Sequence, residues 1–117
     1  MAATAAPIAL QFAAVGAFPG NEGVVFLSPV PRLALLHLHQ QFHTVLEPLG
    51  MRHNPHYLPG MWIPHCTIAI GVPADQVAAA VAVARHTPLP LSLTCAEVGI
   101  VRFRPVEEIQ RFRLCGV

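Results

Sequence analysis

Short apolar runs separated by turn residues dominate the first quarter of the chain. Residues 8–15 (IALQFAAV) predict a β-strand that ends at Gly16, and residues 24–27 (VVFL) predict a second. Between them, residues 18–23 (FPGNEG) contain proline, asparagine and glycine, which favour tight turns. The pattern therefore predicts a β-hairpin at the start of the fold.

A helical pattern begins after Pro31, because the first turn of a helix accepts proline. Apolar residues then recur three or four positions apart as far as Pro48, which predicts a helix over this stretch. The rest of the chain predicts a loop at 51–61, a strand at 62–72, a small helix at 76–85 and strands at 89–93, 97–103 and 109–114. The order ββαβαβββ predicts an α+β fold of antiparallel sheets with two helices packed outside.

The composition narrows the possible function classes. Hydrophobic residues make up 54% of the 117 residues and charged residues only 11%, with a net charge of +1 and no lysine. These values exclude a disordered tail and a broad basic surface for nucleic acid, while a pocket for a single phosphate stays possible. We expect one small domain over residues 1–117, with an apolar face that meets another chain.

Proline and glycine also argue against a membrane span. They interrupt every long apolar run of the first half, and the run at 77–84 ends at Arg85. The first seven residues lack the positive charge and apolar length of a signal peptide. We therefore expect a cytoplasmic protein, whose three cysteines, Cys66, Cys95 and Cys115, are small buried hydrophobic residues.

The segment with the clearest chemistry is Pro64-His65-Cys66-Thr67-Ile68. In a strand, residues two apart share a face, so His65 and Thr67 project together while Cys66 and Ile68 face the core. An imidazole and a hydroxyl side by side can grip one phosphate, because the ring exchanges a proton and the hydroxyl donates a hydrogen bond. The alternative is an edge histidine beside an ordinary strand threonine.

Residues 57–69 (YLPGMWIPHCTIA) resemble the second histidine motif of the two-histidine phosphoesterase superfamily, in its 2′-5′ RNA ligase and cyclic phosphodiesterase branch. Similar blocks occur in the same order at 16–27, 36–39 and 98–105. The family carries two His-x-[Ser/Thr] motifs on the two lobes of a bilobed fold. None of the other histidines here is followed at the second position by Ser or Thr. The resemblance therefore implies a truncated domain, similar to the C-terminal two-thirds of the family fold.

The family resemblance implies a reaction without metal or cofactor. One histidine takes a proton from water and the other gives one to the departing oxygen of a 2′,3′-cyclic phosphate, at an RNA end or in a small cyclic nucleotide. With His65 and Thr67 as its catalytic residues, a single chain supplies one of these roles, so we expect the monomer to be weak or inactive. Whether the chain is an enzyme stays open, as does the choice between hydrolysis and ligation. The alternative is a non-catalytic module that binds a nucleotide or RNA.

Three other groups of residues admit a functional and an ordinary interpretation. Tyr57 and Trp62 flank the motif and either stack on a base or brace the loop. His39 and His43 lie four residues apart, as in zinc-binding helices, and His53 and His56 could add ligands; Gln40 replaces the glutamate of that motif, so we expect no metal. The arginines of the last strands form either a cationic rim or a solvated strand face; they are Arg102, Arg104, Arg111 and Arg113.

A homodimer would complete a site of this kind. In the family the two motifs are related by a pseudo-two-fold axis, and a chain with one motif can pair with a copy of itself across a true two-fold axis. The low charge content favours a large apolar interface of this type.

Overall fold

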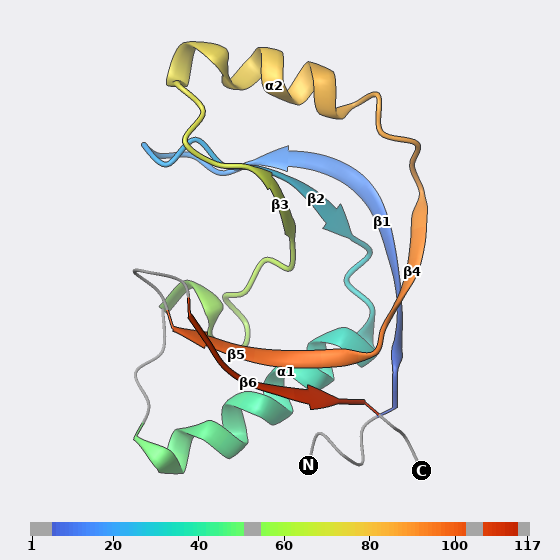
Figure 1. Ribbon diagram of the computed structural model, residues 1–117, viewed down its shortest axis with the longest axis vertical. Helices are drawn as coiled ribbons and strands as arrows, with labels where there is room; N and C mark the ends of the chain where they lie inside the picture. The colour runs from blue at the N-terminus through green and yellow to red at the C-terminus, as the bar shows by residue number, and fades with distance from the viewer. Residues whose placement is uncertain (1–5, 51–54, 103–106, 115–117) are drawn as a thin grey trace. The chain divides into compact units, whose positions relative to one another are not determined.

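The computed structural model describes residues 6–50, 55–102 and 107–114 and shows an α+β fold, as predicted (Figure 1). Its strands are β1 (Ile8–Ala17), β2 (Val25–Pro29), β3 (Cys66–Ala69), β4 (Leu91–Cys95), β5 (Glu97–Arg102) and β6 (Glu107–Arg113). Its helices are α1 (Leu33–Leu46) and α2 (Val77–Ala84), with short 3-10 turns η2 (Glu47–Leu49), η3 (Pro55–Tyr57) and η4 (Ala74–Gln76). The predicted order ββαβαβββ is confirmed.

The chain packs as two compact units. The hairpin unit consists of residues 10–31 and 63–92, and the helix unit consists of residues 1–9, 32–62 and 93–117. The strands form one sheet in the order β3-β2-β1-β4 and a second sheet of β5 and β6. The predicted site residues are divided between the two units. Tyr57 and Trp62 belong to the helix unit, and His65 and Thr67 belong to the hairpin unit.

Strand β2 is the core of the hairpin unit. It pairs antiparallel with β1 on one side and with β3 on the other, and Val25 is only 1% exposed. Helix α2 packs against β2 with its less exposed residues, which recur at helical spacing: Val77, Ala80, Val81 and Ala84. Figure 1 shows this helix along one side of the sheet. The second strand of the predicted hairpin, β2, therefore provides the pairing surface for both β1 and β3.

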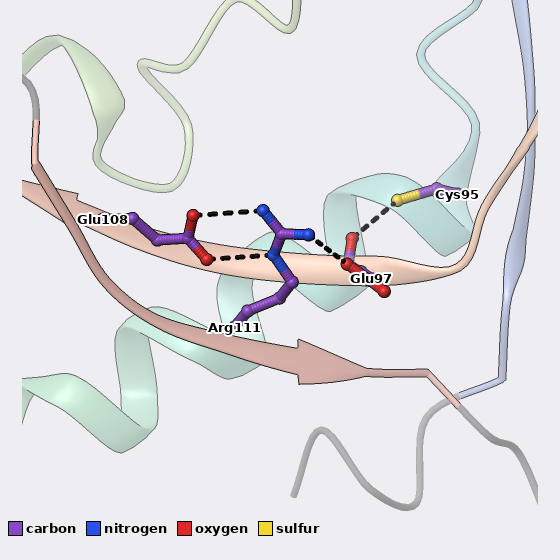
Figure 2. Close-up of polar contacts among 4 residues, drawn as sticks. All are labelled: Cys95, Glu97, Glu108 and Arg111. Carbon is purple, nitrogen blue, oxygen red and sulfur yellow. Dashed lines mark hydrogen bonds and ion pairs between the residues drawn. The ribbon is translucent and has the colours of Figure 1, made fainter.

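In the helix unit, α1 and β6 contact each other through two aromatic rings. The rings of Phe42 and Phe112 lie 5.8 Å apart between centroids. On the same hairpin of β5 and β6, the Arg111 guanidinium bonds to both oxygens of Glu108 at 2.9 and 3.0 Å and to Glu97 at 3.1 Å (Figure 2). The carboxylates of Glu97 and Glu108 thus neutralise the Arg111 charge, which favours the solvated strand face over the cationic rim for this residue. Arg104 and the side chain of Arg102 lie outside the described residues.

Strand β3 is shorter than predicted, and its burial differs from the prediction. The sequence predicts a strand over 62–72 with Cys66 and Ile68 in the core, whereas β3 covers four residues and both side chains are exposed. Two causes act together. Pro64 has no N–H to donate to a neighbouring strand, and β3 stands at the end of the strand order. Ile68 is also left without a partner by a β-bulge, because Thr67 pairs with Phe26 and Ala69 with Val25.

The prediction of buried cysteines is wrong for Cys66, which lies exposed on β3. Cys95 is half-buried, and its thiol donates to the Glu97 carbonyl oxygen at 3.3 Å (Figure 2). Cys115 lies outside the described residues. Among the helices of the described ranges, none has the length and apolar character needed to cross a membrane.

Gly23 ends the turn before β2, and a side chain at this position would disturb the fold strongly. It has a φ of +59°, and a Cβ at this position would overlap the backbone of Val72, whose N–H donates to the Gly23 carbonyl oxygen at 3.1 Å. We predict that Gly23→Ala lowers the free energy of unfolding by about 2–4 kcal/mol, measured by chemical denaturation.

Gly20 supplies the matched control. It also has a positive φ, +113°, but a Cβ there meets no atom within 4 Å. Gly20→Ala should therefore cost only the backbone strain, about 1–2 kcal/mol. Equal losses in the two variants would contradict the role of close packing at Gly23.

Candidate functional site

His65 lies directly before β3 in the hairpin unit, half-buried against two phenylalanine rings. Its ring centroid is 4.8 Å from that of Phe18, at an interplanar angle of 84°, and 5.4 Å from that of Phe26, at 59°. The two phenylalanine rings contact each other at 4.4 Å. One side of the imidazole is thus packed against aromatic carbon.

A backbone carbonyl determines which imidazole nitrogen carries the proton. The Nδ1 atom of His65 lies 2.6 Å from the carbonyl oxygen of Ile63. A carbonyl oxygen only accepts hydrogen bonds, so Nδ1–H is the donor. In the neutral ring, Nε2 then carries the lone pair. The arrangement leaves Nε2 able to accept a proton from, or after protonation donate one to, a bound molecule.

Thr67 lies on β3, two residues after His65 in the hairpin unit. It pairs in register with Phe26, and directly opposed residues of neighbouring strands project from the same face of a sheet. Its side chain is exposed. The structure therefore places both residues of the predicted His-x-Thr pair beside Phe26: His65 through ring contact and Thr67 through strand pairing. The two side chains carry hydrogen-bonding groups, a ring nitrogen on His65 and a hydroxyl on Thr67.

Trp62 and Tyr57 belong to the helix unit and contact a different histidine. The indole of Trp62 stacks on His39 of α1, with 4.0 Å between ring centroids and an interplanar angle of 13°. His39 in turn contacts His43, at 4.6 Å, and forms a hydrogen bond with the backbone of Tyr57. The predicted base-stacking residue thus has one ring face covered by His39, and the structure favours the bracing interpretation for that face. Base stacking by Tyr57 or Trp62 stays a prediction.

The environment of His39 favours its neutral form. Burial lowers the pKa of His39 below its ordinary value of 6.5, and the neighbouring His43 lowers it further, while the hydrogen bond to the Tyr57 backbone acts in the opposite direction. In the part of the chain that the structure describes, no group of three or more metal-ligating side chains gathers. His53, a candidate third ligand, lies outside the described residues, and His56 lies in η3.

The sequence pattern does not predict Phe18 and Phe26 as neighbours of His65. Phe18 belongs to a segment that reads as a turn, and Phe26 reads as an ordinary strand residue. A usable signal is Gly16, which lies inside β1 because this strand runs to Ala17 and not to residue 15 as predicted; glycine inside a strand often marks a close approach of another group. In the structure Gly16 pairs with Phe26, and a Cβ on Gly16 would come within 2.6 Å of the Phe26 ring.

A comparison with protein-family models matches residues 1–107 to the 2′-5′ RNA ligase superfamily. The chain belongs to this superfamily. The match confirms the family resemblance drawn from the His65 motif and its three accompanying blocks. A search of curated proteins finds no match to the sequence. Superfamily membership supports the handling of RNA or nucleotide substrates.

The stack of His39 on Trp62 predicts a pH-dependent fluorescence signal from the chain's single tryptophan. Protonated imidazole quenches indole emission on contact. We predict that Trp62 emission falls as the pH is lowered, with a midpoint below 6.5, because the pKa of His39 is lowered. Because burial and His43 lower the pKa of His39 in the folded chain, the unfolded chain binds the proton more readily, and the fold loses stability as the pH falls from 6.5 through the lowered pKa.

Two variants check the assignment. His39→Gln should abolish the transition, and His43→Gln should move its midpoint to higher pH, because it removes a neighbouring positive charge. If a fluorescence titration of His39→Gln shows the same midpoint as the wild-type protein, a group other than His39 titrates.

Proposed function

We propose that this member of the 2′-5′ RNA ligase superfamily opens 2′,3′-cyclic phosphates at RNA ends or in small cyclic nucleotides. His65 is the proton-transferring residue and Thr67 anchors the phosphate. The observation that carries the proposal is the 2.6 Å contact between His65 Nδ1 and the Ile63 carbonyl oxygen, which leaves Nε2 for the substrate. Superfamily membership supports RNA or a nucleotide as the class of substrate.

The proposed reaction needs one proton acceptor and one proton donor. As the base, neutral His65 takes a proton on Nε2 from a water whose oxygen attacks phosphorus; as the acid, charged His65 gives its Nε2 proton to the ribose oxygen when its bond to phosphorus breaks. In either role the Thr67 hydroxyl donates a hydrogen bond to a non-bridging phosphoryl oxygen. The Ile63 carbonyl oxygen accepts the Nδ1–H hydrogen bond in both protonation states of the ring, so Nε2 is the nitrogen that exchanges the proton.

A second proton-transferring histidine comes, in this proposal, from a second copy of the chain. The 117 residues contain one His-x-Thr motif, and a two-fold dimer presents the same residue twice. Exposed apolar side chains support association: Leu33, Ile70 and Val83 are each 71% exposed, in a chain with only 11% charged residues. The dimer and its joint site are parts of the proposal that can fail separately from phosphate binding by one chain.

The second candidate function is a binding module that holds a nucleotide phosphate without turning it over. The single His-x-Thr motif favours this alternative, since acid–base catalysis by two histidines needs both. Both candidates use the same His65 and Thr67 contacts, so only turnover separates them.

We predict that 2′,3′-cyclic nucleotide opening by the purified protein depends on both residues. His65→Ala should reduce kcat/KM by roughly 10²–10⁴-fold, the usual contribution of a general acid or base. Thr67→Ala should reduce it by roughly 10-fold, the effect of one lost hydrogen bond, and Thr67→Ser should retain most of it. The measurement is product formation followed by chromatography.

His86→Ala is the matched control, because His86 is an exposed histidine of the same hairpin unit outside the proposed site. It should react at the wild-type rate. Equal rates for wild type and His65→Ala would remove His65 from the mechanism. Binding of the nucleotide without any turnover in the wild type would establish the second candidate.

We also predict a dimer in solution. Light scattering at micromolar concentration should give twice the 12.6 kDa mass of the chain. A monomer under these conditions would exclude a catalytic site shared by two copies.

A further inference from the structure

We propose that Phe18 is a positioning residue for His65, and that Gly16 and Phe26 form the base on which Phe18 lies. The proposal rests on the proposed function in so far as His65 is the residue that transfers protons. It assigns a role to three residues of the hairpin that make no proton transfer themselves.

The lowest layer of this arrangement is the contact between Gly16 and Phe26. The two residues are paired across β1 and β2, and the missing side chain of Gly16 makes room for the Phe26 ring, whose atoms come within 2.6 and 2.7 Å of where a Cβ would stand. Phe26 is only 7% exposed. Its ring is therefore held in place by close packing.

Phe18 is held over this ring by its backbone and by its side chain. Its N–H donates to the Val24 carbonyl oxygen at 3.1 Å, which ties the residue to the end of the hairpin. Its ring contacts Phe26 at 4.4 Å, with 31° between the planes. Phe18 is half-buried, so the hairpin presents one aromatic edge or face toward the segment before β3.

His65 meets Phe18 in an edge-to-face geometry, at 84°, while its Nδ1–H bonds to Ile63. Edge-to-face contacts between rings are favourable and depend on orientation. A half-turn of the imidazole would exchange its two edges and break the Ile63 hydrogen bond. The ring contacts and the hydrogen bond together hold the imidazole in one rotamer and one tautomer. Nε2 is then aimed before the substrate arrives, which is the condition for efficient proton transfer.

The test compares Phe18→Leu, which removes the ring but keeps an apolar side chain, with Phe18→Tyr, which restores the ring. Long-range ¹H–¹⁵N spectra of the histidines report the tautomer of His65 without any substrate. We expect Phe18→Leu to mix the two tautomers of His65 and to shift its ring protons, and Phe18→Tyr to keep the wild-type spectrum. In turnover of a 2′,3′-cyclic nucleotide, kcat should fall roughly 10-fold in Phe18→Leu with little change in KM.

Phe12→Leu is the matched control, because Phe12 is a buried phenylalanine of the same strand β1, with no ring contact to His65 among those of the described residues. It should lower stability and leave the His65 spectrum unchanged. Gly16→Ala is a second variant, since its Cβ displaces the Phe26 ring from below and should disturb His65 as Phe18→Leu does.

The outcomes separate the positioning role from the proposed function. A wild-type His65 spectrum in Phe18→Leu overturns the positioning role, whatever the activity. If the wild-type protein shows no turnover, the proposed reaction fails, and the tautomer of His65 in the variants still decides whether Phe18 positions it.

Discussion

The hydrogen bond between His65 and the Ile63 carbonyl oxygen is the constraint on which the candidate site depends. Without it, a half-exposed imidazole interconverts between two tautomers and several rotamers, and neither nitrogen has a fixed task. With it, Nδ1 is the permanent donor and Nε2 is left to the ligand. Pro64 stands between the two partners and lacks an N–H, so this short segment forms the side-chain bond where the predicted strand would have continued.

The position of β3 at the end of the strand order explains why the site is open. A central strand such as β2 is buried on both sides by its neighbours, and Val25 there is almost inaccessible. On β3, Thr67 stays exposed, and the bulge at Ile68 interrupts the regular pairing between Thr67 and Ala69. Bulges are frequent next to functional sites because they redirect the side chains beside them. The same openness leaves Cys66 in solvent.

Local pattern was enough to predict the element order, since proline and glycine mark the turns and the apolar period changes at Pro31. It also predicts His65 and Thr67 as the catalytic pair, and this assignment stays a prediction. It failed where an outcome depends on residues far apart in sequence. Alternation along residues 62–72 assigned Cys66 to the core, because it could not show that the strand has a neighbour on one side only. Similarly, the stack of Trp62 on His39 joins a loop to a helix that lies more than twenty residues earlier.

In the proposed function, His65 Nε2 and Thr67 form a phosphate site backed by aromatic rings. The most direct measurement is a titration of the wild-type protein with inorganic phosphate, followed in long-range ¹H–¹⁵N spectra of its histidines. We expect a saturable shift of the His65 Nε2 resonance, with Nδ1 remaining protonated, and no comparable shift in Thr67→Ala at the same phosphate concentration. Shifts confined to other histidines, with His65 unchanged at saturation, would contradict it.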